Sequence, residues 1–388
     1  MAKLIEITGK CLSGEWGLDD NDGTGIPVLR TTNFTNDGIV NYASVVTRQI
    51  NKRNLEMKYL RKGDIIIEKS GGSDNQPVGR VIYFEGQENT YLFNNFTGLL
   101  RVTKPCVWLP KYVFYALFAN YQKGGTRPFE NKTTGLHNLK TDSYLSSFEI
   151  KDISYAEQCQ IVQQLDKVAD LISLRKQQLQ ELDQLVKSRF IELFGDPISN
   201  PKGLPVKTLK QLSVLITNGN TPKGGSENYV TDGILFIRSQ NVWRNRIELD
   251  DVAFIDESTH YNLRKSSLKH KDILITKTGR INTENSSLGR AALYLGEDDS
   301  ANINGHVYLV RLDGSVVPEY VITILTSEAY RKYIRKVCVG GIDKRQINLD
   351  QVEDFPIILP PIKEQTEFAT FVEQTDKLKY CGDLEVAA

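Results

Sequence analysis

The sequence predicts a mixed α/β protein with two tandem domains, separated by long helices that pair as an antiparallel coiled coil. Three features lead to this fold class. They are an internal repeat with a period of about 208 residues, a heptad pattern between the two copies, and a second helical segment after the second copy.

The clearest repeat is between LRKGDIIIEKSGG (60–72) and LKHKDILITKTGR (268–280), which aligns Asp64 with Asp272 and Lys69 with Lys277. This period is too long for a solenoid and indicates a tandem duplication. We therefore predict one domain at 1–150 and its copy at 198–358. The other matched pairs are Arg30 with Arg238, Asn33 with Asn241, Gly71 with Gly279, Arg80 with Arg290, Gly124 with Gly340 and His137 with Ile347.

Each domain has the pattern of a small sheet with helices and long loops. The runs DIIIE, VIYF, DILIT and HVYLV are short, rich in β-branched residues and bounded by turns, which is typical of strands. Residues 111–120 and 318–334 carry apolar side chains at helical spacing. Loops such as SGGSDNQP are rich in Gly, Asn and Ser, and functional residues often lie on such loops.

One long helix is predicted in the segment 151–197. Ser154 and Glu157 fit a capping box at its start, and FGDP (194–197) ends it with a glycine and a proline. Apolar residues recur at steps of four, three or seven, with Arg175 at a seam position that is not apolar, and this is the pattern of a coiled-coil seam. The seam residues are Ile161, Leu165, Val168, Ile172, Leu179, Leu182, Val186 and Leu193.

A shorter second helix is predicted in 359–388, beginning at Pro360-Pro361, because proline suits the first turn of a helix. It would pair antiparallel with the first helix through Phe368, Phe371 or Val372, and Leu378. The heptad pattern stops after Leu378, so the second helix would cover only part of the first. The alternative is that each helix packs only on its own domain.

Composition and charge are those of a globular protein, with 388 residues, 40% hydrophobic content and no net charge. The five cysteines are scattered, which argues against a disulfide framework or a zinc site. No apolar run is long enough for a membrane span, and the N-terminus lacks a signal-peptide core. We therefore expect a cytoplasmic protein. Lysines and arginines cluster at matching places in both domains, which favours a nucleic acid as the ligand.

The order of these segments resembles the specificity subunit of a type I restriction-modification system. The resemblance extends over almost the whole chain. It rests on AEQCQIVQQLDKV (156–168), FIELFGDP (190–197), FPIILPPIKEQ (355–365), IRSQNV (237–242) and DILITKTG (272–279).

This resemblance implies two target-recognition domains that each read one half of a bipartite double-stranded DNA sequence. It also implies spacer helices that set the spacing and dock two methyltransferase (modification) subunits, with restriction subunits in the larger complex. The chain itself would be non-catalytic and would bind no cofactor. The partner subunits would use S-adenosylmethionine, ATP and magnesium.

Candidate DNA contacts are basic and amide side chains near turns, because cations bind phosphates and Arg, Asn and Gln suit base edges. Residues shared by both domains fit scaffold or phosphate roles better, whereas the loops that differ are expected to read bases. The candidates are Arg30, Asn33, Lys69, Ser73, Asn75, Gln76, Arg80 and Arg127 in the first domain, and Lys223, Arg238, Gln240, Asn241, Lys277, Arg280, Asn282, Arg290, Lys344 and Arg345 in the second.

Two alternative functions are left open. A metal-dependent nuclease would use Asp64, Glu68 and Lys69, but the second copy has Thr276 in place of Glu68. A protein-binding scaffold would make no DNA contact, and the basic loops argue against it. The sequence has no GxxxxGK[ST] motif for ATP and no Asn-Pro-Pro-aromatic tetrad of a methyltransferase.

Overall fold

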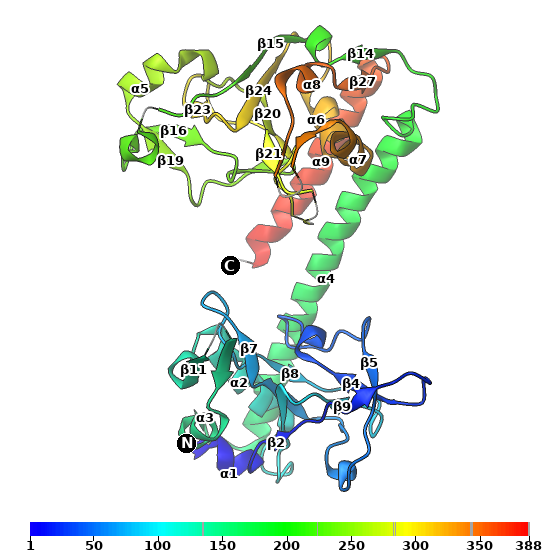
Figure 1. Ribbon diagram of the computed structural model, residues 1–388, viewed down its shortest axis with the longest axis vertical. Coiled ribbons are helices and arrows are strands. Elements are labelled where there is room, and N and C mark those ends of the chain that lie inside the picture. Colours follow the sequence, from blue (N-terminus) through cyan, green and yellow to red (C-terminus); the bar gives the residue numbers. More distant parts are fainter. Residues whose placement is uncertain (134–135, 223, 282, 284, 342–343, 387–388) are drawn as a thin grey trace. The chain divides into compact units, whose positions relative to one another are not determined.

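The computed structural model describes residues 1–388 except 134–135, 223, 282, 284, 342–343 and 387–388. The chain forms two compact units, Met1–Ser173 (unit 1) and Leu174–Ala388 (unit 2). Both units are mixed α/β, which confirms the predicted fold class (Figure 1). The boundary between the units falls inside the long helix.

The strands of unit 1 are short and form four small sheets within its described residues. They are β1 (Ala2–Lys3), β2 (Leu12–Ser13), β3 (Leu18–Asp19), β4 (Ile26–Leu29), β5 (Val46–Gln49), β6 (Ile65–Glu68), β7 (Ser70–Gly72), β8 (Val81–Tyr83), β9 (Leu92–Phe93), β10 (Thr97–Leu100), β11 (Glu130–Thr133), β12 (Leu136–Leu139) and β13 (Glu149–Ile150). The strand orders are β2-β10-β6-β8, β3-β5-β4-β9, β11-β12-β7 and β1-β13. β4 and β9 are parallel.

Unit 2 repeats this arrangement. Its strands are β14 (Val206–Thr208), β15 (Ser213–Asn218), β16 (Ile234–Ile237), β17 (Val242–Trp243), β18 (Arg246–Ile247), β19 (Ala253–Ile255), β20 (Ile273–Thr276), β21 (Thr278–Gly279), β22 (Ala291–Leu293), β23 (Ala301–Ile303), β24 (Val307–Leu312), β25 (Val339–Gly340), β26 (Arg345–Gln346) and β27 (Pro356–Ile358). The orders are β15-β24-β20-β22, β19-β16-β23, β21-β26-β25 and β14-β27, with β17-β18 as a separate hairpin. β16 and β23 are parallel, as β4 and β9 are. The predicted duplication is therefore confirmed in the sheets.

The helices bear out most of the predicted segments. They are α1 (Leu4–Thr8), α2 (Pro110–Gln122), α3 (Thr141–Ser147), α4 (Tyr155–Phe194), α5 (Glu257–Asn262), α6 (Pro318–Thr326), α7 (Glu328–Val337), α8 (Leu349–Glu353) and α9 (Ile362–Val386). The single helix predicted at 318–334 is instead two, α6 and α7, which are separated at Ser327. Ser327 has extended backbone, and its Oγ accepts a hydrogen bond from Tyr330 N at 3.1 Å, which makes it the N-cap of α7.

Strand pairing corrects the match of Gly71 with Gly279 in the repeat between residues 60–72 and 268–280. His137 pairs with Gly72, and Arg345 pairs with Gly279. The counterpart of Gly279 is therefore Gly72, and His137 matches Arg345 rather than Ile347. Gly71 is an extra residue where the register shifts, and its φ of 143° is a conformation that favours glycine.

The second glycine match is also wrong. Gly340 pairs with Arg345 inside the β25-β26 hairpin, whereas Gly124 follows the C-terminus of α2. Each glycine therefore occupies a different place in its unit.

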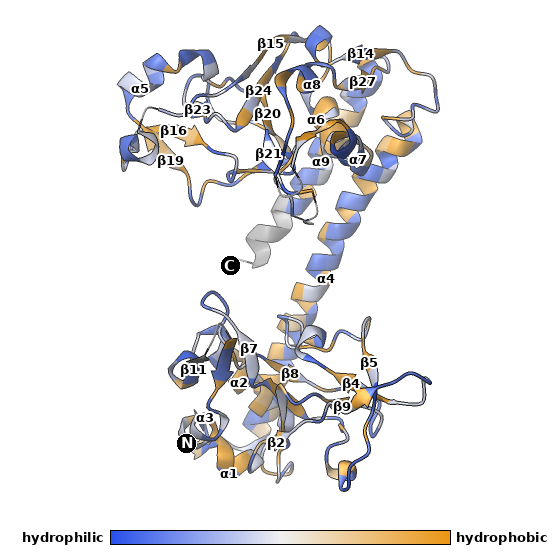
Figure 2. Cartoon of the chain, viewed as in Figure 1, coloured by the Kyte–Doolittle hydropathy of each residue, from blue (hydrophilic) through white to orange (hydrophobic). Residues whose placement is uncertain are grey.

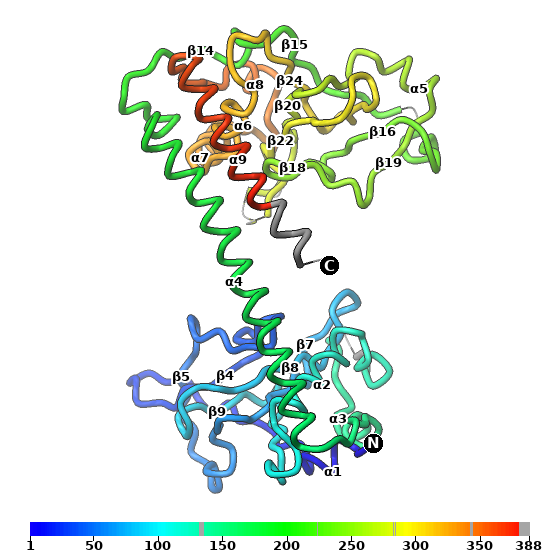
Figure 3. Tube along the Cα trace, turned by 180° about the vertical axis from the view of Figure 1, so that it is seen from behind, coloured from blue at the N-terminus to red at the C-terminus, as the bar shows by residue number. Residues whose placement is uncertain are grey.

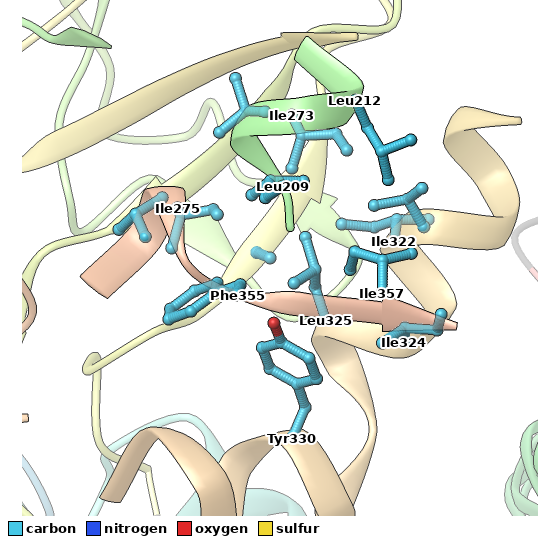
Figure 4. Close-up of a cluster of buried hydrophobic side chains, with 14 of the residues drawn as sticks. Leu209, Leu212, Ile273, Ile275, Ile322, Ile324, Leu325, Tyr330, Phe355 and Ile357 are labelled. Carbon is cyan, nitrogen blue, oxygen red and sulfur yellow. The ribbon is translucent and has the colours of Figure 1, made fainter. Parts of the chain in front are cut away.

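Alternating side chains of the central strands divide each core into two layers. Ile65 and Ile67 of β6 face one apolar cluster and Ile66 faces another. In unit 2, Ile273 and Ile275 of β20 face a cluster with Leu209, Phe355 and Tyr330 (Figure 4), while Leu274 faces the other side. Strands buried on both faces explain why DIIIE and DILIT are continuous apolar runs.

A buried glutamine fixes the start of α4 and of α9. The Oε1 atom of Gln158 in α4 accepts a hydrogen bond from Leu109 N at 2.8 Å, next to the N-terminus of α2. The Oε1 atom of Gln365 in α9 accepts one from Val317 N at 3.1 Å, next to the N-terminus of α6. The glutamine of the repeated Glu-Gln pair therefore ties α4 to unit 1 and α9 to unit 2.

Within unit 2, α9 packs antiparallel to the C-terminal part of α4, and the ribbon and the tube seen from behind both show the two side by side (Figures 1 and 3). The ring of Phe368 lies 5.5 Å from that of Phe190, centroid to centroid. Further along, Lys379 Nζ lies 2.7 Å from Asp183 Oδ1. Residue numbers rise along α9 as they fall along α4, so the direction of this pairing is the predicted one.

The predicted seam is only partly buried. Val186 and Leu193 pack against the core of unit 2, but Leu378 is 60% exposed and Thr375 is the buried residue of that turn. The prediction for Leu378 was therefore wrong.

The first half of the seam is exposed. Figure 2 shows hydrophilic and hydrophobic residues alternating along the visible part of α4. The next residue, Val162, packs on the core of unit 1 instead of Ile161. The exposed seam residues are Ile161, Leu165, Val168 and Ile172.

The capping box at the start of α4 is formed as predicted. Ser154 N donates to Glu157 Oε2 at 2.9 Å, and Glu157 N donates to Ser154 Oγ at 3.3 Å. The hydrogen bond from the Ser154 hydroxyl, followed by that from its backbone, lowers the pKa of Glu157 below its ordinary value. A depressed pKa means that this stabilisation is present above the ordinary pKa of Glu157 and is lost as pH falls through the folded value.

Ser154→Ala is expected to loosen the first turn of α4, because loss of an N-cap hydroxyl typically costs about 1 kcal/mol. Amide hydrogen exchange of residues 155–160 should rise roughly fivefold at neutral pH, and the difference from the wild type should shrink in acid. Ser173→Ala, in the middle of the same helix, serves as the control. Equal protection of Ser154→Ala and the wild type at neutral pH would contradict the capping role.

Candidate nucleic-acid interface

The asparagines shared by the two units act inside the scaffold. Asn33 is buried, and its Oδ1 accepts from Arg30 N at 2.9 Å while its Nδ2 donates to Asn41 O at 3.0 Å. Asn241 is also buried and accepts from Arg238 N at 3.0 Å. Both amides hold the turn that follows β4 or β16, so we leave Asn33 and Asn241 out of the proposed interface.

The matched aspartates are also structural. Asp64 receives two hydrogen bonds from the guanidinium of Arg101, at 2.7 and 2.6 Å. Asp272 receives the same pair from Arg311, at 2.9 and 2.7 Å. This bidentate geometry uses both carboxylate oxygens, which argues against a nuclease metal site at Asp64. No cluster of three metal-ligating side chains occurs among the residues that the structure describes.

The matched lysines lie at equivalent strand ends and are half-buried. Lys69 Nζ donates to Ser13 Oγ at 2.9 Å, and Lys277 Nζ lies 5.6 Å from the ring centroid of Tyr308. Arg30 and Arg238 are likewise half-buried beside their turns. These four cations stay candidates for phosphate contact.

Arg80 and Arg290 are matched in the fold, because their carbonyls accept from Glu68 N and Thr276 N. Their guanidinium groups point into the protein. Arg80 Nη2 donates to Thr31 O at 2.9 Å, whereas the guanidinium of Arg290 lies 3.9 Å from the ring centroid of Trp243. We therefore assign both arginines to positioning nearby loops rather than to direct DNA contact.

A shallow cleft in unit 1 brings together three predicted residues, Asn75, Gln76 and Arg127. Its volume is about 600 Å³. The Arg127 guanidinium donates to Asp74 O at 3.3 Å, and Ser73 closes the turn by donating from its N to Gln76 O at 2.7 Å. The lining residues are Asn36, Asn75, Gln76, Pro77, Tyr121, Gln122, Lys123, Gly124 and Arg127. Amides and cations in one concave surface are the groups that bind base edges and phosphates.

His137 beside this cleft was not among the predicted DNA contacts. Its Nδ1 lies 3.0 Å from Glu130 Oε2, and its Nε2 lies 3.6 Å from Asp74 Oδ1. Glu130 Oε1 also accepts from Val78 N at 3.0 Å. These contacts tie the loop 73–77 to the β11-β12 hairpin. In the sequence, the only feature that pointed to His137 was its position in the internal repeat.

Unit 2 carries an arginine-rich surface in the equivalent place. The β17-β18 hairpin corresponds to the bridge between Phe34 and Val40, and α7 stands where unit 1 has residues 123–129. Arg335 of α7 donates to Ile281 O at 3.1 Å in the loop that follows β21. The hairpin tip supplies Arg244, which is exposed.

The predicted residues of unit 2 have different environments. Arg280 and Lys344 are exposed, and Arg345 is half-buried in β26. Gln240 Nε2 donates to Asp251 Oδ2 at 2.8 Å. The predicted residues Lys223 and Asn282 lie outside the described residues.

The fold and these surfaces define a duplicated protein with a polar and basic surface at one equivalent place in each unit. Residues 1–184 match the family model described as the type I restriction modification DNA specificity domain. Within the described part of the chain, no helix has the length and apolarity to cross a membrane.

Curated relatives extend the likeness to nearly the whole chain. The chain is 24% identical over 389 residues to the type I restriction enzyme StySPI specificity subunit of Salmonella potsdam, covering 95% of this chain and 79% of that protein. It is 24% identical over 375 residues to the EcoKI specificity subunit of Escherichia coli, covering 90% and 75%. A Methanocaldococcus jannaschii relative is 23% identical over 179 residues, and the chain covers 40% of its length.

Solved structures agree in fold. The S subunit of a type I restriction-modification system from M. genitalium has a TM-score of 0.53 with 15% identity, and the match covers all of this chain and 91% of that one. A chain from a structure of type I restriction-modification complex assembly has a TM-score of 0.51 with 14% identity, covering all of this chain and 92% of that one.

Proposed function

We propose that this chain is the DNA-recognition subunit of a type I restriction-modification system, with unit 1 reading one half of a bipartite target and unit 2 the other. One observation carries the proposal. Equivalent scaffolds present different side chains at the same place, namely amides around Gln76 in unit 1 and arginines around Arg244 in unit 2. A shared scaffold with divergent loops is what two readers of different sequences require.

We propose that the chain has no catalytic group of its own. Methylation and cleavage would reside in methyltransferase and restriction subunits, which would carry S-adenosylmethionine, ATP and magnesium. The exposed first half of the α4 seam, with Leu165 and Val168, is an apolar stripe suited to packing against such partners. A scaffold without DNA contact is a weaker proposal, because it leaves the two divergent polar surfaces without a role.

Methylation mapping tests this function. DNA from cells that produce the chain with its cognate methyltransferase subunits is sequenced by long reads that detect modified bases. We expect one methylated motif with two specific parts separated by a nonspecific spacer of fixed length. A contiguous motif, or methylation that persists when the chain is deleted, would refute the proposal.

A further inference from the structure

The arginine-rich surface of unit 2 differs from the cleft of unit 1 in its side chains, because guanidinium groups take the place of most of the amides. The charges of Arg331, Arg335 and Glu328 in α7 act on the guanidinium of Arg244 at the hairpin tip. Arg244 is exposed, but partial desolvation by its neighbours, followed by the charge of Arg331, lowers its pKa. Three guanidinium groups beside one carboxylate form a site with excess positive charge.

The fold holds this cluster in place. Tyr330 and Ile334 of α7 are buried in the core, so Arg331 and Arg335 lie one position further along the helix, towards the surface. The N-cap at Ser327 begins the helix there. Arg331 is anchored by Glu328, with 3.5 Å between Nη1 and Oε2. The cations are therefore presented from a rigid helix, which limits the entropy lost on binding.

Two arginine side chains packed on the ring of Trp243 support the β17-β18 hairpin. The guanidinium of Arg290 lies 3.9 Å from the ring centroid of Trp243, and that of Arg246 lies 5.4 Å from the same ring. Arg290 Nε also donates to Ser286 O at 3.1 Å, which connects the stack to the loop after β21. Arg244, next to Trp243, is thereby held on the same surface as this loop.

We propose that Arg244, Arg331 and Arg335 form a phosphate-binding surface for the DNA backbone in unit 2, whereas the cleft of unit 1 combines amides for base contacts with the cations Lys123 and Arg127. This proposal rests on the proposed function and adds a division of labour within it. Clustered guanidinium groups match phosphate oxygens and release counterions when they bind, so this surface contributes directly to the salt dependence of binding.

The test uses the full chain with its methyltransferase subunits, and duplexes with and without the methylated motif. The double variant Arg244→Gln/Arg331→Gln leaves Arg335 and its loop contact intact. We expect it to weaken binding to both duplexes alike and to lower the slope of log affinity against log salt by about 1.8. The wild type would then lose roughly tenfold more affinity than the variant between 50 and 200 mM salt.

Lys210→Gln is the matched control, because Lys210 is an exposed cation of the same unit that pairs with Glu353 at 2.7 Å. It should keep the wild-type slope. Arg244→Lys/Arg331→Lys should restore most of the slope, because lysine retains the charge. Thermal unfolding of each variant checks that it folds. If the glutamine double variant does not fold, the lysine double variant still provides a valid test.

Two results distinguish a failure of the phosphate assignment from a failure of the proposed function. A variant that loses affinity only for the motif duplex, with an unchanged slope, overturns the phosphate assignment in favour of base contact. A wild-type complex that does not distinguish the two duplexes contradicts the proposed function instead.

Discussion

Gln76→Ala is expected to weaken binding to the cognate duplex by about 1–3 kcal/mol, or roughly 5- to 150-fold. The Gln76 side chain lines the cleft of unit 1, and its Nε2 lies 3.5 Å from Tyr121 Oη. A contact this long is weak, so the amide is available to pair with a base edge. Competition binding against duplexes altered in one half of the motif measures the loss.

Gln87→Ala is the control for Gln76→Ala, because Gln87 is an exposed amide in a loop of the same unit outside the cleft. It should leave affinity unchanged. Gln76→Ala should also tolerate altered bases in one half of the motif only. Full discrimination of both halves by this variant would remove Gln76 from base recognition.

Phe368→Ala is expected to destabilise unit 2 by about 3–5 kcal/mol, the usual cost of removing a buried aromatic side chain. Phe368 is 1% exposed, and its ring lies 5.5 Å from Phe190 and 5.7 Å from Phe194, centroid to centroid. The substitution therefore opens a cavity at the point where α9, α4 and the core of unit 2 meet. Thermal unfolding of the full chain should show a transition lowered by roughly 10 °C.

Phe371→Ala provides the comparison for Phe368→Ala. Phe371 is on the same helix but only partly buried, so its loss should cost clearly less. Equal effects of the two substitutions would show that α9 is not anchored mainly through Phe368.

Local patterns explain what the sequence could predict of the fold. The capping box at Ser154, the apolar strand runs and the duplication are contiguous patterns, and the structure contains all three. The heptad seam was a weaker guide, because position in the sequence does not say which apolar residue meets a neighbour. Val162 and Thr375 are buried where Ile161 and Leu378 were expected.

The candidate site depended on contacts between distant segments. Gln76 and Arg127 were chosen separately, and only the fold places them in one cleft. The grouping of Arg244 with Arg331 depends on a hairpin and a helix nearly ninety residues apart. Asn33 was predicted to contact DNA because asparagine suits adenine, but it is buried and has a structural role in the scaffold.

The central claim is that each unit reads its own half of the target. Its most direct measurement is methylation mapping of a chain in which residues 1–150 are replaced by the corresponding domain of another specificity subunit. We predict a motif in which one half changes to that of the donor, while the other half and the spacer stay the same. An unchanged motif, or a change in both halves, would contradict the account.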